Sequence, residues 1–307
     1  MNIPFPVRGN VPAVVTPFDE AGDILFGDYE RILRWHLDRG VDGLCIAGDN
    51  GESWTLSVSE RAKLAEMAVR VAAGRVPVVM GASATTARQT IAYAQAVADK
   101  GVTALMIGPQ PYVMKATTSE LVARFETIHR AVPLPILLYN SPRRTHISLT
   151  IDSMRALVEA VPIIALKEAS RDFFYLTHVI REFKDKLAVL IGPAPFIIPG
   201  VQLGAAGFVS SGPEFFGQET AKVMAAAVTT LDEGMRSLHY RYTVIYETLM
   251  GLGTWPSSLK ATHNLLGVSA GVPREPVSPL AGDDLAKLKR VLQEIGVLEA
   301  SGVRTAA

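Results

Sequence analysis

The stretch "PIIALKEAS" (162–170) joins an unbroken apolar run to a lysine and a glutamate. Runs that are apolar throughout, rather than alternating, are typical of parallel strands buried on both faces of a sheet. A lysine at the end of such a strand is costly, because burial disfavours its charge. We therefore expect Lys167 to be ion-paired, neutral or chemically useful.

The same pattern recurs along the chain, where a short apolar run ends in small or polar residues and an amphipathic stretch follows. The other runs are 11–18, 41–48, 76–83, 102–109, 134–142, 187–194 and 207–212. Capping-box spacing at Ser57–Glu60, Thr86–Gln89 and Thr117–Glu120 predicts helix starts between them. Eight strand–helix units predict an α/β fold, a (β/α)8 TIM barrel over residues 1–231.

The alternative fold is an open doubly wound sheet. That fold often carries a glycine-rich phosphate-binding turn after its first strand, and here the first run ends in "VTPF". Residues 232–307 show helical patterns at 237–250, 257–267 and 282–296 and no strand-like run. They predict a C-terminal helical extension of the barrel.

Composition limits the classes of partner. Lys+Arg and Asp+Glu balance at 30 each, so no bulk field favours nucleic acid or a membrane surface. A single cysteine, Cys45, excludes an internal disulfide framework and fits a reducing compartment. The sequence contains no membrane-span pattern and no signal-peptide pattern. We expect a soluble, cytoplasmic protein with a small-molecule ligand.

Candidate catalytic residues follow from the barrel prediction, because barrel enzymes work at the C-terminal ends of their strands. Lys167 ends the sixth run. A desolvated lysine amine has a lowered pKa, and the neutral amine attacks carbonyls to form Schiff bases. The alternative is an ion pair with Glu168 at the barrel rim, and position alone does not decide between the two.

The ends of the second and fifth runs offer three supporting groups, each with a plainer alternative. Tyr139 can pass protons beside Lys167, or it is a core-edge tyrosine bonded to backbone. The loop "GDNGES" (48–53) can direct backbone N–H groups at a carboxylate, or it is an ordinary turn. Arg144, with Arg143 as its adjacent competitor, can bind a carboxylate, or both are solvated loop charges.

Metal chemistry is disfavoured by the sequence. The six histidines show no metal-ligand spacing, and Cys45 lies within an apolar run, where a buried apolar role is expected. We therefore expect no metal and no other cofactor.

Five motifs in order resemble one known family: "AVVTPF", "GDNGESWTLS", "YNSPRRT", "LKEAS" and "LGAAGFVSS". They are similar to those of the dihydrodipicolinate synthase / N-acetylneuraminate lyase family of pyruvate-type class I aldolases. The resemblance implies a TIM barrel, a Schiff-base lysine, no metal, and a homo-oligomer, either a tetramer or a dimer.

The resemblance also implies roles by position. Lys167 and Tyr139 match the family's Schiff-base lysine and proton-relaying tyrosine, and Asp49-Asn50 matches the pair that holds the 2-oxo acid carboxylate. Arg144 matches the arginine that binds the second substrate's carboxylate in the synthase branch. The residues on pocket-lining positions are Thr16, Gly192, Val209 and Ser211.

Departures from the family pattern bear on the subfamily. Asp49 stands where the family usually has the first threonine of Gly-Thr-Thr-Gly-Glu, and Val113 replaces the second tyrosine of a Pro-Tyr-Tyr segment. Two of the three relay hydroxyls of the synthase are thus missing. The acidic pair of the sialic acid lyases falls on Ala194-Pro195, and "GDNGE" comes closer to the loop of 4-hydroxy-2-oxoglutarate aldolases. Asp49 is expected to be either an acid/base or hydroxyl-binding group, or a cap of its own turn.

The sequence therefore predicts a Schiff-base lyase that acts on pyruvate or another 2-oxo acid, such as a 4-hydroxy-2-oxo acid or a 2-keto-3-deoxy sugar acid. The alternatives are a 4-hydroxy-tetrahydrodipicolinate synthase and a 2-keto-3-deoxy acid dehydratase or deaminase. A catalytically inactive metabolite-binding barrel is the alternative of a different class. A phosphate-handling barrel is a poor match, because the loops after the last two runs are not glycine-rich phosphate loops.

Overall fold

The computed structural model describes residues 6–226 and 231–299. Its sheet has eight strands in the order β1-β8-β7-β6-β5-β4-β3-β2, and every neighbouring pair is parallel. The strands are β1 (Gly9–Asn10), β2 (Leu44–Ile46), β3 (Val78–Gly81), β4 (Ala104–Ile107), β5 (Ile136–Asn140), β6 (Ile163–Glu168), β7 (Ala188–Ile191) and β8 (Gly207–Phe208).

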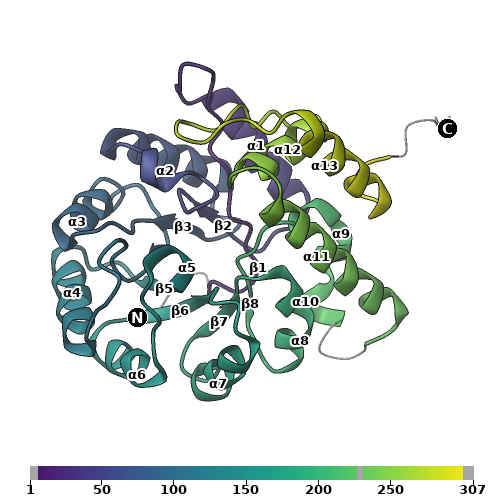
Figure 1. Cartoon of the computed structure of the whole chain (residues 1–307). Coiled ribbons are helices and arrows are strands. Elements are labelled where there is room, and N and C mark those ends of the chain that lie inside the picture. The colour runs from purple at the N-terminus through teal and green to yellow at the C-terminus, as the bar shows by residue number, and fades with distance from the viewer. Residues whose placement is uncertain (1–5, 227–230, 300–307) are drawn as a thin grey trace.

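Helices surround the curled sheet, as Figure 1 shows. Those between strands are α1 (Phe26–Asp38), α2 (Val58–Ala72), α3 (Ala87–Gln95), α4 (Thr118–Ala131), α5 (Pro142–Thr145), α6 (Ile151–Ala160), α7 (Phe173–Phe183) and α8 (Ile197–Gln202). The helices after β8 are α9 (Gln218–Ala221), α10 (Val223–Ala226), α11 (Glu233–Gly251), α12 (Ser257–Leu265) and α13 (Gly282–Glu294). Short 3-10 turns are η1 (Ser53–Thr55), η2 (Ala194–Phe196) and η3 (Pro213–Phe216).

The first strand lies earlier than the sequence predicted. Residues 11–18 were expected to form it, and the structure instead has the two-residue strand β1 just before them. Pro12 and Pro17 lack the N–H that a sheet ladder needs, so this run cannot pair continuously. It still lies beside β2, because the Val14 N–H donates to the Cys45 carbonyl (2.8 Å) and the Cys45 N–H donates to the Pro12 carbonyl (3.0 Å).

Side chains that face the inside of the curled sheet form a core of their own. It draws residues from every strand between β2 and β7, including Cys45, Val79, Leu137, Ala165 and Leu190. The prediction of a buried, apolar Cys45 is confirmed. Because strand side chains alternate between faces, Tyr139 and Lys167 share the inward face of Leu137 and Ala165.

Two of the three predicted capping boxes are confirmed, and the third forms only one of its two hydrogen bonds. Ser57–Glu60 and Thr117–Glu120 form complete capping boxes. Thr86 accepts the Gln89 N–H as predicted, but the Gln89 side chain donates to the Tyr93 hydroxyl instead of returning to the cap. The aromatic neighbour one turn later thus competes successfully for the Gln89 amide.

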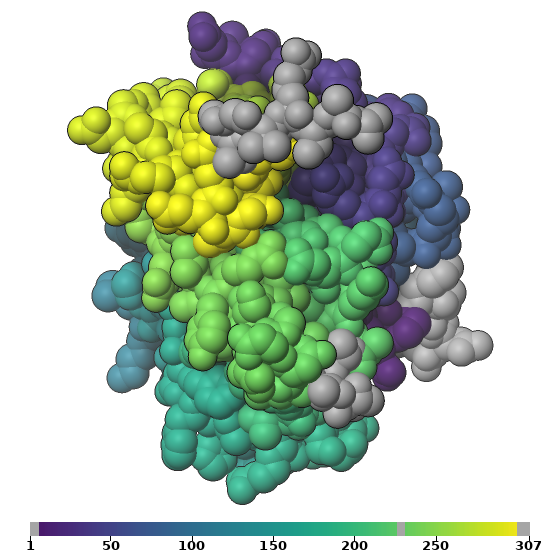
Figure 2. Space-filling model, turned by 90° about the vertical axis from the view of Figure 1, so that its right-hand side faces the viewer, coloured from purple at the N-terminus to yellow at the C-terminus, as the bar shows by residue number. Residues whose placement is uncertain are grey.

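The C-terminal helices α11–α13 pack across one side of the molecule and meet the N-terminal region. Figure 2 shows them in green to yellow beside the purple segment that contains α1. An antiparallel bridge joins Phe18 to Val272, and the Arg274 Nε donates to the Gly22 carbonyl (2.6 Å). No helix in the described ranges is long and apolar enough to span a membrane.

Candidate active site

Lys167 and Tyr139 are register partners on the adjacent strands β6 and β5. The Lys167 Nζ lies 4.7 Å from the centroid of the Tyr139 ring, and only 7 % of the lysine is exposed. Both side chains follow inward-facing core residues at the C-terminal strand ends. The alternation of strand side chains therefore brings the two predicted residues together at the mouth of the sheet.

Glu168 does not neutralise Lys167. Its carboxylate accepts from the Asn140 Nδ2 (2.6 Å) and from the Ser170 N–H (2.7 Å), since adjacent strand residues point to opposite faces. In residues 6–226 and 231–299 no ion pair involves Lys167. Burial lowers the pKa of Lys167, while the nearby Cys45 and Asp49 oppose that shift. The rim ion pair considered from sequence is absent from the described structure.

The Asp49 carboxylate bonds to both Tyr139 and Arg144. Its Oδ2 accepts from the Tyr139 hydroxyl (2.9 Å) and from the Arg144 Nε (3.1 Å). Burial, and then the charge of Asp49, raise the pKa of Tyr139 well above its ordinary value. The Asp49 side chain thus faces Tyr139 and Arg144 rather than its own turn.

Hydrogen bonds to three other segments of the chain hold the loop that carries Asp49 and Asn50 in place. The Asn50 Nδ2 donates to the Ala13 carbonyl and to the Ser211 hydroxyl, each at 2.8 Å. The Thr16 hydroxyl donates to the Gly51 carbonyl (2.9 Å). In the described part of the chain, no hydrogen bond uses the backbone N–H of Asp49 or Asn50. These amides are therefore free for a ligand, and their binding of an anion stays a prediction.

A buried ion pair supports the same loop. Glu52 is fully buried, has a positive φ of 54°, and its Oε1 lies 2.5 Å from the Lys260 Nζ of α12. Its Oε2 accepts from the Arg274 N–H (2.8 Å), and the Lys260 Nζ also donates to the Val272 carbonyl (2.7 Å). Burial raises the pKa of Glu52 and lowers that of Lys260 to about 8, and their mutual attraction opposes both shifts.

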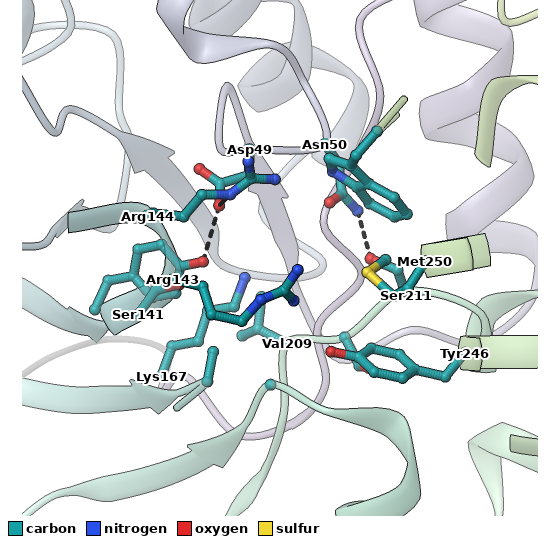
Figure 3. A pocket seen from close by; sticks show the side chains of 15 residues that line it. Asp49, Asn50, Ser141, Arg143, Arg144, Lys167, Val209, Ser211, Tyr246 and Met250 are labelled. Carbon is teal, nitrogen blue, oxygen red and sulfur yellow. Dashed lines mark hydrogen bonds and ion pairs between the residues drawn. The ribbon is translucent and has the colours of Figure 1, made fainter. Parts of the chain in front are cut away.

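These residues surround a pocket at the strand ends (Figure 3). Eight of the nine predicted site residues line it. Thr16 does not, because its hydroxyl is buried under the loop at Gly51. Gly192 is there for close packing, since a Cβ would lie 2.5 Å from that of Ala169. Ser210, which ends the last strand-like run beside Ser211, lines it too. The lining residues that the sequence did not single out are Ser141, Ala169, Tyr246, Met250 and Trp255.

The C-terminal extension supplies one wall of this pocket. Tyr246 and Met250 are four residues apart on α11 and therefore share a helix face. That spacing was readable from the sequence, but nothing in it indicated which face would meet the strand ends. Trp255 comes from the turn between α11 and α12 and carried no comparable signal.

No group of three or more His, Cys, Asp or Glu side chains in the described ranges is arranged to hold a metal ion. A buried amine at a strand end with no carboxylate partner in the described ranges, beside a phenol and a loop with free backbone amides, is typical of class I lyases, which form Schiff bases with their substrates. Fold and site together define that class.

Comparisons with known proteins agree. The model of the dihydrodipicolinate synthetase family matches residues 6–295, and the chain belongs to this family. A 4-hydroxy-tetrahydrodipicolinate synthase of Koribacter versatilis is 31% identical over 95% of this chain and 97% of its own. That of Methanococcus aeolicus is 30% identical over 95% of this chain and its entire own length.

Solved structures show the same architecture. The chloride-inhibited dihydrodipicolinate synthase of Acinetobacter baumannii, crystallised with pyruvate, superposes with a TM-score of 0.89 at 27% identity. It covers 95% of this chain and 100% of its own.

Proposed function

We propose that this protein is a class I lyase that forms a Schiff base between Lys167 and the ketone of pyruvate or another 2-oxo acid. The observation that carries the proposal is the buried Lys167 amine, whose pKa burial lowers and which has no carboxylate partner in the described ranges. A neutral amine is the nucleophile that imine formation requires. Family membership supports the same activity.

The first half of the reaction follows from the site. The Lys167 nitrogen attacks the ketone carbon, and the carbinolamine loses water to give a protonated imine. The free amides of Asp49 and Asn50 hold the substrate's C1 carboxylate. Tyr139, which its raised pKa keeps protonated, supplies the proton for the departing water.

Asp49 supports the second half. It is hydrogen-bonded to Tyr139 and lies beside the cationic Arg144, so it can accept a proton from a substrate hydroxyl. Loss of that proton lets a C–C bond break in an aldol cleavage, with the electron pair passing to the imine. We propose aldol cleavage of a 4-hydroxy-2-oxo acid or a 2-keto-3-deoxy sugar acid. The same groups also suit water loss in a dehydratase.

The second candidate is 4-hydroxy-tetrahydrodipicolinate synthase, the activity for which the curated relatives are named. The presence of Arg144 in the pocket favours it. Asp49 and Val113 count against it, because neither side chain offers the hydroxyl that the synthase relay uses at its position.

The test is reductive trapping with pyruvate and borohydride, followed by peptide mass mapping. We expect one reduced adduct, on Lys167, and none in Lys167→Arg. Lys260 is an internal control, because it is also buried but is ion-paired to Glu52. A failure of pyruvate to modify Lys167, or equal modification of Lys260, would contradict the proposed chemistry.

The proposal also covers the closure of the barrel, the division of the chain, the oligomeric state and the cellular location. We propose that the edge contacts near Cys45 close the sheet into a (β/α)8 barrel, with residues 1–231 as the catalytic unit and 232–307 as its extension. The boundary adjoins residues 227–230, which lie outside the described ranges. We also propose a homotetramer or dimer, and a reducing, cytoplasmic location for the free thiol of Cys45.

A further inference from the structure

Arg144 is already engaged inside the protein. Its Nε donates to Asp49 at 3.1 Å, and the same carboxylate oxygen accepts from Tyr139. A guanidinium that is paired with an internal carboxylate attracts a second anion less strongly, because the local charge is largely balanced. The arginine that sequence reasoning assigned to a substrate carboxylate is therefore the less available of two neighbours.

Arg143 is the available one. Its side chain reaches into the pocket over Lys167, as Figure 3 shows, and it lines the cavity. Throughout residues 6–226 and 231–299, no carboxylate pairs with it. Partial burial lowers the pKa of Arg143, and so do the like charges of Arg171 and Arg144. An unpaired cation held among other cations indicates a place for an anion.

Tyr246 completes this part of the pocket from the opposite wall. Its hydroxyl accepts from the Arg171 Nε (3.1 Å), and the Arg171 guanidinium lies 5.0 Å from the centroid of its ring. A phenol that accepts one hydrogen bond still has its own hydrogen to donate. In Figure 3 the Tyr246 ring extends toward the centre of the pocket, on the side of Arg143.

The charges that line the pocket are unequal. One carboxylate, Asp49, faces the cations Arg143, Arg144 and Lys167. When Lys167 is neutral and Arg144 is paired with Asp49, Arg143 remains as an excess positive charge. In the proposed function the free amides of Asp49 and Asn50 hold the C1 carboxylate, so the excess charge is left for another group.

We propose that the pocket takes 2-oxo acids with a second carboxylate at the far end of the carbon chain, and that Arg143 and the Tyr246 hydroxyl bind this second carboxylate. Arg171 acts through Tyr246 as a positioning residue. This inference rests on the proposed function for the placement of the C1 carboxylate, and it assigns the second anion to residues other than Arg144.

The experiment compares two ligands of equal length, 2-oxoglutarate and 2-oxopentanoate, which differ by a terminal carboxylate in place of a methyl group. Half-saturating concentrations for borohydride trapping on Lys167 are measured in the wild type, in Arg143→Gln and in the exposed control Arg181→Gln. A charged hydrogen bond contributes about 1.5–3 kcal/mol, so we expect Arg143→Gln to weaken 2-oxoglutarate about 10- to 100-fold. We expect 2-oxopentanoate to change less than about threefold, and the control to change neither ligand.

Two results would overturn the inference. Equal losses for both ligands would place Arg143 at the C1 carboxylate, and no loss for either would remove it from binding. Calorimetry with glutarate, which has two carboxylates and no ketone, separates this inference from the proposed function. Glutarate binding that needs Arg143, without any Lys167 adduct, would refute the Schiff base and keep the subsite. If Lys167 forms an adduct but Arg143→Gln binds glutarate as tightly as the wild type, the Schiff base stands and the Arg143 subsite is refuted.

Discussion

Replacing Lys260 by methionine should destabilise the protein and disturb the substrate loop together. Lys260→Met keeps the length of the side chain but leaves the carboxylate of Glu52 fully buried without its cation. Removing one partner of a buried pair costs about 3–5 kcal/mol. Glu52 keeps the Arg274 N–H and can take up a proton, since burial already raises its pKa. We therefore expect Lys260→Met to lower the free energy of unfolding by about 3 kcal/mol, the lower end of this range.

The matched control is the double variant Glu52→Gln/Lys260→Met, in which both charges are removed and the Arg274 N–H keeps an acceptor. It should lie within about 1–2 kcal/mol of the wild type, because neutral replacement of a buried pair is often well tolerated. An unfolding entropy of about 2.1 cal/mol/K per residue converts 3 kcal/mol into a fall in Tm of ~5 °C for 307 residues.

Calorimetry and urea titration measure these differences, and pyruvate trapping reports the loop. Glu52 follows the Asp49–Gly51 segment directly, so the single variant should also need more pyruvate for half-maximal trapping. A loss of stability below about 1 kcal/mol in Lys260→Met would refute the reasoning. A double variant as unstable as the sum of its singles would refute it equally.

Two further changes test groups at and away from the pocket. Asp49→Asn should lower kcat about 100-fold while pyruvate still traps on Lys167, because a general base is lost and imine formation is not; unchanged turnover with a cleavable substrate would contradict the acid/base role of Asp49. Burial lowers the pKa of His263 to about 3, so the unfolded chain binds the extra proton below about pH 6.5. From pH 7.5 to 5 the contribution of His263 to stability should therefore fall by about 2 kcal/mol relative to a variant without this histidine. His263→Phe should remove this loss, which thermal unfolding at the two pH values measures; Glu214, whose pKa burial raises to about 8, acts in the opposite direction and is present in both proteins.

Local patterns predicted the parts of the site that local rules control. Lys167 and Tyr139 were predictable because each ends an apolar run, and strand alternation then fixes the face on which they lie. The pairing of Asp49 with Arg144 spans 95 residues and depends on side-chain rotamers, which a single sequence does not contain. The prediction of a strand at 11–18 was wrong because it relied on the apolar content of the run and gave too little weight to its two prolines, which cannot donate to a sheet ladder.

The wall formed by α11 was beyond sequence reasoning for a different reason. Helical periodicity predicted the helix, but its docking depends on distant partners, namely η2, α8 and Arg171. Tyr246 and Trp255 therefore had no local feature to separate them from ordinary surface aromatics. The family resemblance did not supply them either, because its motifs lie mainly in the strands and the loops that follow them.

The position of Tyr246, Met250 and Trp255 in the chain has a consequence for synthesis on the ribosome. Asp49 and Asn50 emerge early, whereas the last wall of their pocket follows about 200 residues later. At about 5–20 residues per second, the nascent chain waits some ~10–40 s between the two. Lys167 also emerges before these three residues, so a ribosome-bound chain of that length lacks the last wall of the pocket that the released protein has.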